Sequence, residues 1–216
     1  VAQAASPPAS WEGLVLVKSK RLDRVYLLTG ADFRPYAKVM LDPTEVAFRK
    51  NWIRDYNSTL RGGGERLDQQ HADRIMEAVR TGMGDIFAKA YREAGYEVVQ
   101  TAGPDVLRVR TGVINLAIAA PDVMTAGRSR TFSSEAGEAT LVLEARDSQT
   151  GALLGRALDA RAVGDSAPYM RNSVNNIAEF QRVFAIWAKA SVEGLGKLKT
   201  MSPIGAGGAP APAPQR

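Results

Sequence analysis

Three carboxylates near one apolar segment are the side chains in this sequence best suited to acid–base chemistry. Asp32 precedes the segment, and Asp42 and Glu45 flank the point where Pro43 interrupts it. Two carboxylates about 5–10 Å apart can hydrolyse a glycosidic bond. Asp42-Pro43 also has a structural interpretation, because proline cannot donate to a sheet ladder and marks a strand end or bulge. An acid-pair hydrolase is therefore an alternative, and the leading expectation is that the protein is not an enzyme.

Other catalytic and metal chemistry is restricted by composition. The sequence contains one histidine, His71, and no cysteine. These counts exclude zinc fingers, cysteine nucleophiles and sites that need two histidines. The run Gly62-Gly63-Gly64 lacks the Lys-Ser/Thr pair of a phosphate-binding loop. We expect His71 to be an exposed residue in the first turn of a helix, and we predict no cofactor, no metal and no catalytic residue.

A partner surface is predicted in the segment 51–66, the least regular internal stretch of the sequence. It contains Trp52, Arg54, Tyr56 and Arg61 and ends in three glycines. Tryptophan, tyrosine and arginine are over-represented among interface hot spots. The structural alternative is that the two aromatic rings pack back on the body of the domain, and for Trp52 this burial is the favoured interpretation.

The charge balance is basic. The chain has 216 residues, 45% of them hydrophobic, and a net charge of +5. Its densest basic stretch contains Lys18, Lys20, Arg21 and Arg24. Such a stretch suits an anionic membrane or a nucleic acid, or it is simply a solvated face. No aromatic residue interleaves these charges as a base-stacking platform would, so a nucleic acid is not an expected partner.

The periodicity predicts an α+β fold. Apolar residues recur at helical spacing over residues 68–94 and 173–198, and apolar or alternating segments predict strands between them. We expect a largely antiparallel mixed sheet in the order β-β-α-β-β-β-α, with the two long helices packed on one face. Residues 11–202 form the single domain, residues 1–10 a flexible tether, and residues 203–216 a disordered tail rich in Gly, Pro and Ala.

Local features give sharper expectations. Asp68 is a plausible N-cap and Gly95 a left-handed residue after the first helix. The apolar alternation changes phase between residues 106 and 118, which requires an inserted residue, and Gly112 is the predicted bulge. Glycines 82 and 84 lie within the first helix and indicate close approach to the sheet. Asp159 and Arg161, two residues apart, are expected to form a surface ion pair.

Three segments carry a resemblance to a known family. They are Tyr36–Pro43, Glu144–Leu154, and the helical Trp187-Ala188. Over residues 11–198 the sequence resembles an uncharacterised family of proteobacterial lipoproteins, the domain of unknown function DUF3313. The resemblance implies export, a lipid-modified N-terminal cysteine and attachment to a membrane facing the periplasm. This chain contains no cysteine, and the family supplies no catalytic or binding residues to carry over.

The leading hypothesis is a non-catalytic accessory or interaction domain of the cell envelope, periplasmic and anchored as a lipoprotein, with another envelope protein as its partner. The membrane is contacted only through an N-terminal lipid anchor outside this chain. The first alternative is a periplasmic small-ligand binding protein, with a pocket between the sheet and the helices and the segment 51–66 as its lid. The second is the acid-pair hydrolase.

Overall fold

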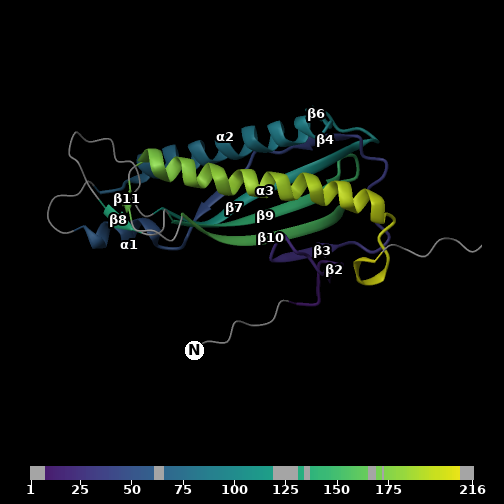
Figure 1. Ribbon diagram of the computed structural model, residues 1–216, viewed down its shortest axis with the longest axis horizontal. Coiled ribbons are helices and arrows are strands. Elements are labelled where there is room, and N and C mark those ends of the chain that lie inside the picture. Colours follow the sequence, from purple (N-terminus) through teal and green to yellow (C-terminus); the bar gives the residue numbers. More distant parts are fainter. Residues whose placement is uncertain are drawn as a thin grey trace, which may run out of the picture.

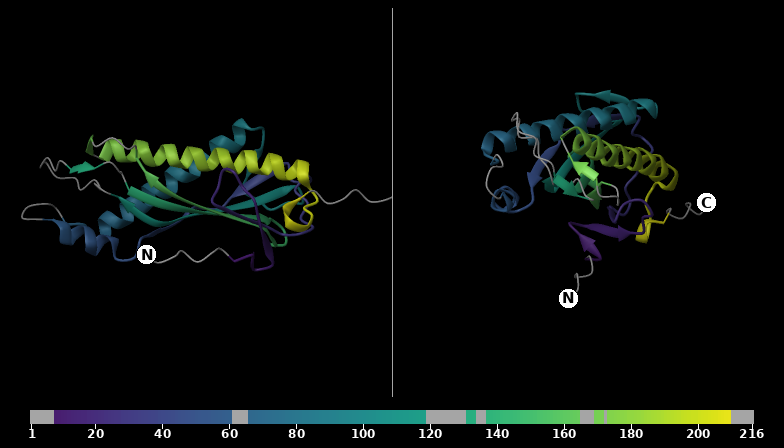
Figure 2. Two further views of the ribbon diagram at one scale, coloured as in Figure 1. Left: turned by 60° about the horizontal axis from the view of Figure 1, so that its bottom comes forward. Right: turned by 60° about the vertical axis from the view of Figure 1, so that its left-hand side comes forward.

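Two long helices lie side by side across one face of a twisted sheet (Figure 1, Figure 2). The computed structural model describes residues 8–60, 66–118, 131–133, 137–164, 169–171 and 173–209. The helices are α2 (Gln69–Glu93) and α3 (Ser173–Met201). The predicted α+β class is therefore confirmed, with both long helices on the same face.

The sheet is mixed, and its strands run β1-β2-β3-β10-β9-β7-β4-β6, with β5 also paired to β7. The pairs among β1, β2, β3, β10, β9 and β7 are antiparallel, whereas β4 and β5 run parallel to β7 and β6 runs parallel to β4. Strands β8 and β11 form a separate two-stranded sheet. The strand bounds are β1 Ser10–Trp11, β2 Leu14–Val17, β3 Arg24–Leu27, β4 Lys38–Leu41, β5 Glu45–Phe48, β6 Glu97–Val99, β7 Val106–Ile118, β8 Thr131–Ser133, β9 Gly137–Asp147, β10 Leu153–Val163 and β11 Tyr169–Arg171.

The core fills the space between the sheet and the two helices. Phe87 of α2 and Trp187 of α3 are 1% and 0% exposed and belong to the same apolar cluster. Tyr91 of α2 joins Ser191 of α3 through hydroxyl groups 2.7 Å apart, and burial raises the pKa of Tyr91 to about 12. Both helical stripes identified in the sequence therefore face inward.

The ends of α2 follow the expected local signals. The Asp68 carboxylate accepts the backbone N–H of His71, and the His71 ring reaches back to the Asp68 backbone N–H. Gly95 follows the helix with a φ of 88°. His71 itself is not the exposed residue that we expected. Its side chain is 11% exposed because the capping interaction holds it against the domain.

The glycines within α2 are not explained by close approach to the sheet. A Cβ added at Gly82 or Gly84 would meet nothing within 4 Å, so the expectation of a tight contact is wrong. Each glycine costs the helix backbone entropy without a steric reason in the described part of the chain.

We therefore expect Gly82→Ala to raise the free energy of unfolding by about 0.5–1 kcal/mol. Gly95→Ala is the matched control, because its φ of 88° is strained for any residue with a Cβ. The control should lower stability, and urea melts of both variants measure the two effects. Stabilisation by Gly95→Ala, or a loss of stability in Gly82→Ala, would contradict the assignment.

Strands β4 and β5 form one interrupted row beside β7. Residues 38–41 pair with 106–109, and Glu45 pairs with Gly112 further along the same strand. Pro43 lies in the gap between the two strands, as its missing N–H requires. In that gap the buried hydroxyl groups of Thr44 and Thr111 are 2.7 Å apart.

The bulge in β7 exists, but it is three residues later than predicted. Gly112 pairs in register with Val142, and the register against β9 shifts only between Ile114 and Ala117. The extra residue is Asn115, whose φ is 52°. Asparagine tolerates this left-handed conformation better than most residues with a Cβ, and a single residue of this kind reverses which face the later side chains occupy.

The predicted topology omits short elements and ends the domain too early. Strands β1, β2 and β6 and helix α1 (Trp52–Thr59) are not in the expected order of elements. Ile204 is 1% exposed and exchanges backbone hydrogen bonds with Gly30 and Ala31, so the packed chain continues past residue 202. The 3-10 helix η1 (Ala206–Gly208) follows. Of the predicted tether over residues 1–10, Ser10 lies in β1 and residues 1–7 lie outside the described residues. Of the predicted tail over residues 203–216, residues 210–216 lie outside them.

Candidate functional site

The face of the sheet turned away from the helices, which we call the outer face, carries a row of ion pairs at one end. This row, called the ion-pair row below, extends from the residue after β4 across the three strands β7, β9 and β10. The Arg108 Nη2–Asp42 Oδ2 distance is 2.9 Å, and Arg110 Nε lies 3.3 Å from the same oxygen. The Glu144 carboxylate accepts from Arg146 and Arg156 at 2.9 and 2.6 Å. The full set of residues is Asp42, Arg108, Arg110, Glu144, Arg146 and Arg156.

Arg156 is the most buried cation of this row. It is 8% exposed, and its guanidinium carbon lies 4.2 Å from the Trp11 ring centroid. Burial acts to raise the pKa of Glu144, but hydrogen bonds from Arg146 and Arg156 outweigh it and hold the pKa below its ordinary value. Both sides of this ion pair therefore stay charged at neutral pH.

The carboxylates singled out for acid–base chemistry are also engaged by arginines. Asp42 and Glu45 both contact Arg110, while hydrogen bonds from Arg34 lower the pKa of Asp32. A general acid needs a pKa raised toward neutrality, whereas hydrogen bonds from arginines hold the pKa values of Asp32 and Glu144 below their ordinary values. Within the described residues, no group of three or more His, Asp or Glu side chains could hold a metal ion.

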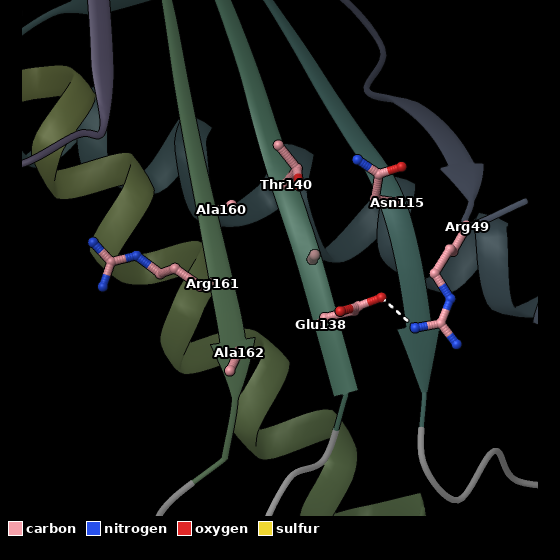
Figure 3. Close-up of a pocket in the computed structure, with 8 residues that line it drawn as sticks. Arg49, Asn115, Glu138, Thr140, Ala160, Arg161 and Ala162 are labelled. Carbon is pink, nitrogen blue, oxygen red and sulfur yellow. Dashed lines mark hydrogen bonds and ion pairs between the residues drawn. The ribbon is translucent and has the colours of Figure 1, made fainter. Parts of the chain in front are cut away.

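A hollow lies on the outer face at the other end of the sheet, near the Asn115 bulge (Figure 3). Its volume is about 330 Å³. Ala160 and Ala162 of β10 contribute small exposed side chains. Beside them, an ion pair of 2.5 Å between Arg49 Nη1 and Glu138 Oε1 joins the residue after β5 to β9. We call this feature the outer-face hollow. Its lining residues are Arg49, Asn115, Glu138, Ala139, Thr140, Ala160, Arg161 and Ala162.

The polar side chains that line the outer-face hollow do not all point in the same direction. Figure 3 shows Asn115, Thr140 and Glu138 on neighbouring strands, whereas Arg161 extends away from them beyond β10. The bulge positions Asn115 here, because it inserts one residue into β7 at this level. Bulges of this kind re-aim side chains and are common beside binding sites. The arrangement offers hydrogen bonds and one ion pair, and it suits binding.

The small-ligand alternative placed its pocket between the sheet and the helices. The outer-face hollow lies on the opposite face, and the layer between sheet and helices holds fully buried rings such as Phe33, Phe87 and Trp187. A ligand-binding role for this protein therefore has its structural support on the open side of the sheet.

The residues predicted as a partner surface are separated by the structure. Trp52 is 4% exposed and stacks on Phe48 with ring centroids 4.6 Å apart, so its burial, the favoured interpretation, is confirmed. Arg54 is exposed and pairs with Asp55, and burial raises the pKa of the half-buried Tyr56. Arg61 lies outside the described residues. A partner contact at Arg54 stays a prediction.

The segment that carries these residues is not the irregular loop that we expected. Residues 52–59 form helix α1, which starts after Asn51 in the left-handed region at φ 63°. A second hollow of about 530 Å³ is lined by residues 48–54. It shares Arg49 with the outer-face hollow, so the two hollows adjoin at this residue.

Asp159 has a different role from the predicted one. Its ion pair with Arg161 forms, with Nε–Oδ2 2.6 Å, but Asp159 is 2% exposed rather than on the surface. The same carboxylate accepts the indole N–H of Trp187 at 2.8 Å and the backbone N–H of Asp23 at 3.1 Å. Asp159 thus faces the helices and fixes α3 to the sheet.

Arg49, Asn115, Glu138 and the ion-pair row were not expected as functional candidates from the sequence. A signal was present for the row, since the charged residues of Arg108-Val109-Arg110 and of Glu144-Ala145-Arg146 each recur at a spacing of two. This spacing places the charges of each strand on one face. Which of these strands are neighbours follows only from the register.

The fold and these sites define a small α+β domain with an open, polar sheet face. The chain belongs to the family described as "Protein of unknown function (DUF3313)", whose model matches residues 8–191. No curated protein matches the sequence. None of the helices, as far as the chain is described, has an apolar stretch long enough to cross a membrane.

Several solved structures are similar to the chain at low identity. A PelC dodecamer structure from Paraburkholderia phytofirmans is 12% identical, with a TM-score of 0.36 over 75% of this chain and 94% of that chain. A Xanthomonas campestris protein of family DUF330 is 10% identical, with a TM-score of 0.37 over 77% and 90%. A DUF4136 family protein from Bacteroides thetaiotaomicron is 11% identical, with a TM-score of 0.30 over 87% and 98%.

Proposed function

We propose that this protein is a non-catalytic accessory domain of the bacterial cell envelope that binds another envelope protein through its outer sheet face. One observation carries the proposal. Asp42, Glu45 and Glu144 of that face each form an ion pair with arginine, and the lowered pKa of Glu144 keeps its carboxyl group ionised. Such a face presents fixed charges and hydrogen-bonding groups to a partner.

The envelope location rests on sequence features. The segments 36–43 and 144–154 carry the resemblance to lipoproteins, and Ala4–Ser10 has the small, proline-rich composition of a tether. We propose that the protein is periplasmic and anchored by a lipid on a residue upstream of Val1.

The part of the outer face proposed to bind the partner is the outer-face hollow. At the opposite end of the face, Trp11 covers Arg156, whereas Ala160 and Ala162 are exposed and small. A hollow with small side chains and a polar surround admits a protruding side chain of a partner, as interface pockets do.

We expect Ala160→Arg to abolish capture of the envelope partner while leaving the melting temperature nearly unchanged. Ala160 is exposed, so the added side chain fills the hollow without entering the core. The matched control is Ala185→Arg on the exposed side of α3. The measurement is affinity capture from envelope extracts of cells that carry the complete gene, with fractionation of the same cells to locate the protein.

Equal capture by wild type and Ala160→Arg would rule out the hollow as the binding surface. Recovery of the complete gene product in the cytoplasmic fraction would overturn the envelope location.

A second candidate function is favoured by the same hollow. Its volume of about 330 Å³ is of the size that holds a small polar ligand, and amide, hydroxyl and carboxylate groups line it. Native mass spectrometry of the purified protein separates the two functions, because a bound small molecule would add a defined mass that Arg49→Ala removes.

A further inference from the structure

A cluster of cations near the N-terminal strands is not used by the proposed function. Lys18, Lys20, Arg21 and Arg24 are exposed in and beside the connection from β2 to β3, and we call them the basic loop. Arg21 forms an ion pair with Glu193 of α3. This pair joins the basic loop to the helix layer.

Helix α3 adds two more cations at this contact. Lys189 and Lys197 lie one turn on either side of Glu193, and Lys189 Nζ is 4.0 Å from the Glu193 carboxylate. Glu193 is thus shared between two cations, while Lys18, Lys20, Arg24 and Lys197 have no ion-pair partner within the part of the chain that the structure describes. The basic loop together with Lys189 and Lys197, called the patch below, therefore carries excess positive charge.

The acidic residues of the patch offset only part of its charge. Asp23 is exposed, and one oxygen of its carboxylate accepts the backbone N–H of Ala160 at 2.9 Å. A negatively charged surface would therefore meet six cations against two carboxylates, those of Asp23 and the shared Glu193.

The chain enters the domain beside this patch. The backbone N–H of Leu16 donates to the carbonyl of Ala9 at 3.0 Å, and Ser10 pairs with Val15 in antiparallel register. Pro8 therefore lies toward the end of β2 from which Lys18 follows. Anything that precedes the domain in the chain joins it next to the basic loop.

We propose that the basic loop, together with Lys189 and Lys197, binds the headgroups of an anionic phospholipid bilayer. This inference rests on the proposed tethering, which would bring the same end of the domain to a membrane. Each lysine or arginine near an anionic membrane strengthens binding about fivefold. Lysines act there as point charges that need no fixed geometry, and the loop lacks the aromatic residues that bind nucleic-acid bases.

The test uses the chain Val1–Arg216 and flotation with vesicles. The probe vesicles contain phosphatidylethanolamine and phosphatidylglycerol, and the reference vesicles contain phosphatidylcholine alone. The loop variant is Lys18→Glu with Lys20→Glu, and the matched control is Lys50→Glu with Arg74→Glu, two exposed cations outside the patch. Both variants change the net charge equally.

We expect wild type and the control to bind the anionic vesicles alone, with binding that weakens as salt rises. The loop variant should bind at least about 25-fold more weakly, from the two lost cations. Equal loss in loop variant and control, equal binding to neutral vesicles, or tighter binding to duplex DNA than to anionic vesicles would each overturn the proposal. Because this chain carries no lipid, failure here leaves the tethering proposal to be decided by cell fractionation.

Discussion

Replacing Trp187 by alanine is expected to lower the free energy of unfolding by about 3–5 kcal/mol. The indole is 0% exposed and packs on Phe184 with ring centroids 6.0 Å apart. Its N–H also donates to the buried Asp159 carboxylate at 2.8 Å. The substitution therefore opens a cavity and leaves a buried carboxylate with one hydrogen bond fewer.

The neighbouring Ile186→Ala is the matched control, because Ile186 is 47% exposed on the same helix. This control should lower the free energy of unfolding by only about 0.5 kcal/mol. Urea melts give both values, and Trp187→Phe separates the lost hydrogen bond from the lost volume. A loss below about 1 kcal/mol in Trp187→Ala would mean that α3 does not pack as described.

The second large effect is expected at Glu144, in the ion-pair row. Glu144→Gln should lower the free energy of unfolding by about 2–3 kcal/mol, because the buried Arg156 loses a charged acceptor and keeps only Glu12 at 2.7 Å. The control is Glu45→Gln, whose side chain is 74% exposed in its pair with Arg110. Exposed pairs contribute about 0–1 kcal/mol.

The pH dependence of this effect has a defined sign. The folded-state pKa of Glu144 lies below its ordinary value of 4.5, so the carboxylate is more acidic in the folded than in the unfolded chain. The stabilisation is therefore fully present above pH 4.5 and is lost as pH falls through the folded-state pKa. The stability difference between wild type and Glu144→Gln should shrink in that range, and a difference that grows on acidification would contradict the assignment.

The features predicted from sequence are those that local patterns determine. The stripe of α2, its Asp68 cap and its Gly95 terminator lie within one segment. Periodicity and capping chemistry identify such features without knowledge of distant contacts.

The features that sequence reasoning missed depend on partners far along the chain. Asn115 and Gly112 are both consistent with the phase change, and glycine is the more usual residue at positive φ, yet pairing with β5 and β9 places the bulge at Asn115. Helix α1 has no side-chain cap, and its Trp52 packs on Phe48 of β5. Tertiary packing thus defines an element that local signals do not indicate.

The contacts of the candidate site also join residues that are far apart in the sequence. Arg49 and Glu138 form one ion pair although 89 residues separate them, and Asp159 meets Trp187 only because β10 lies under α3. Residue type made Trp52 a candidate interface residue beside the favoured interpretation of burial, and that burial follows from the stacking partner that β5 supplies. Composition identifies residues capable of binding, but exposure decides which of them do.

In-cell photo-crosslinking tests the central proposal, that the outer sheet face binds an envelope protein, most directly. A photoreactive amino acid replaces Ala160 in the complete gene, and in a second strain it replaces Ala185 on the exposed side of α3. Binding through this face should give one discrete crosslinked envelope protein from position 160 and none from position 185. The absence of a crosslink at position 160, or the same product from both positions, would contradict it.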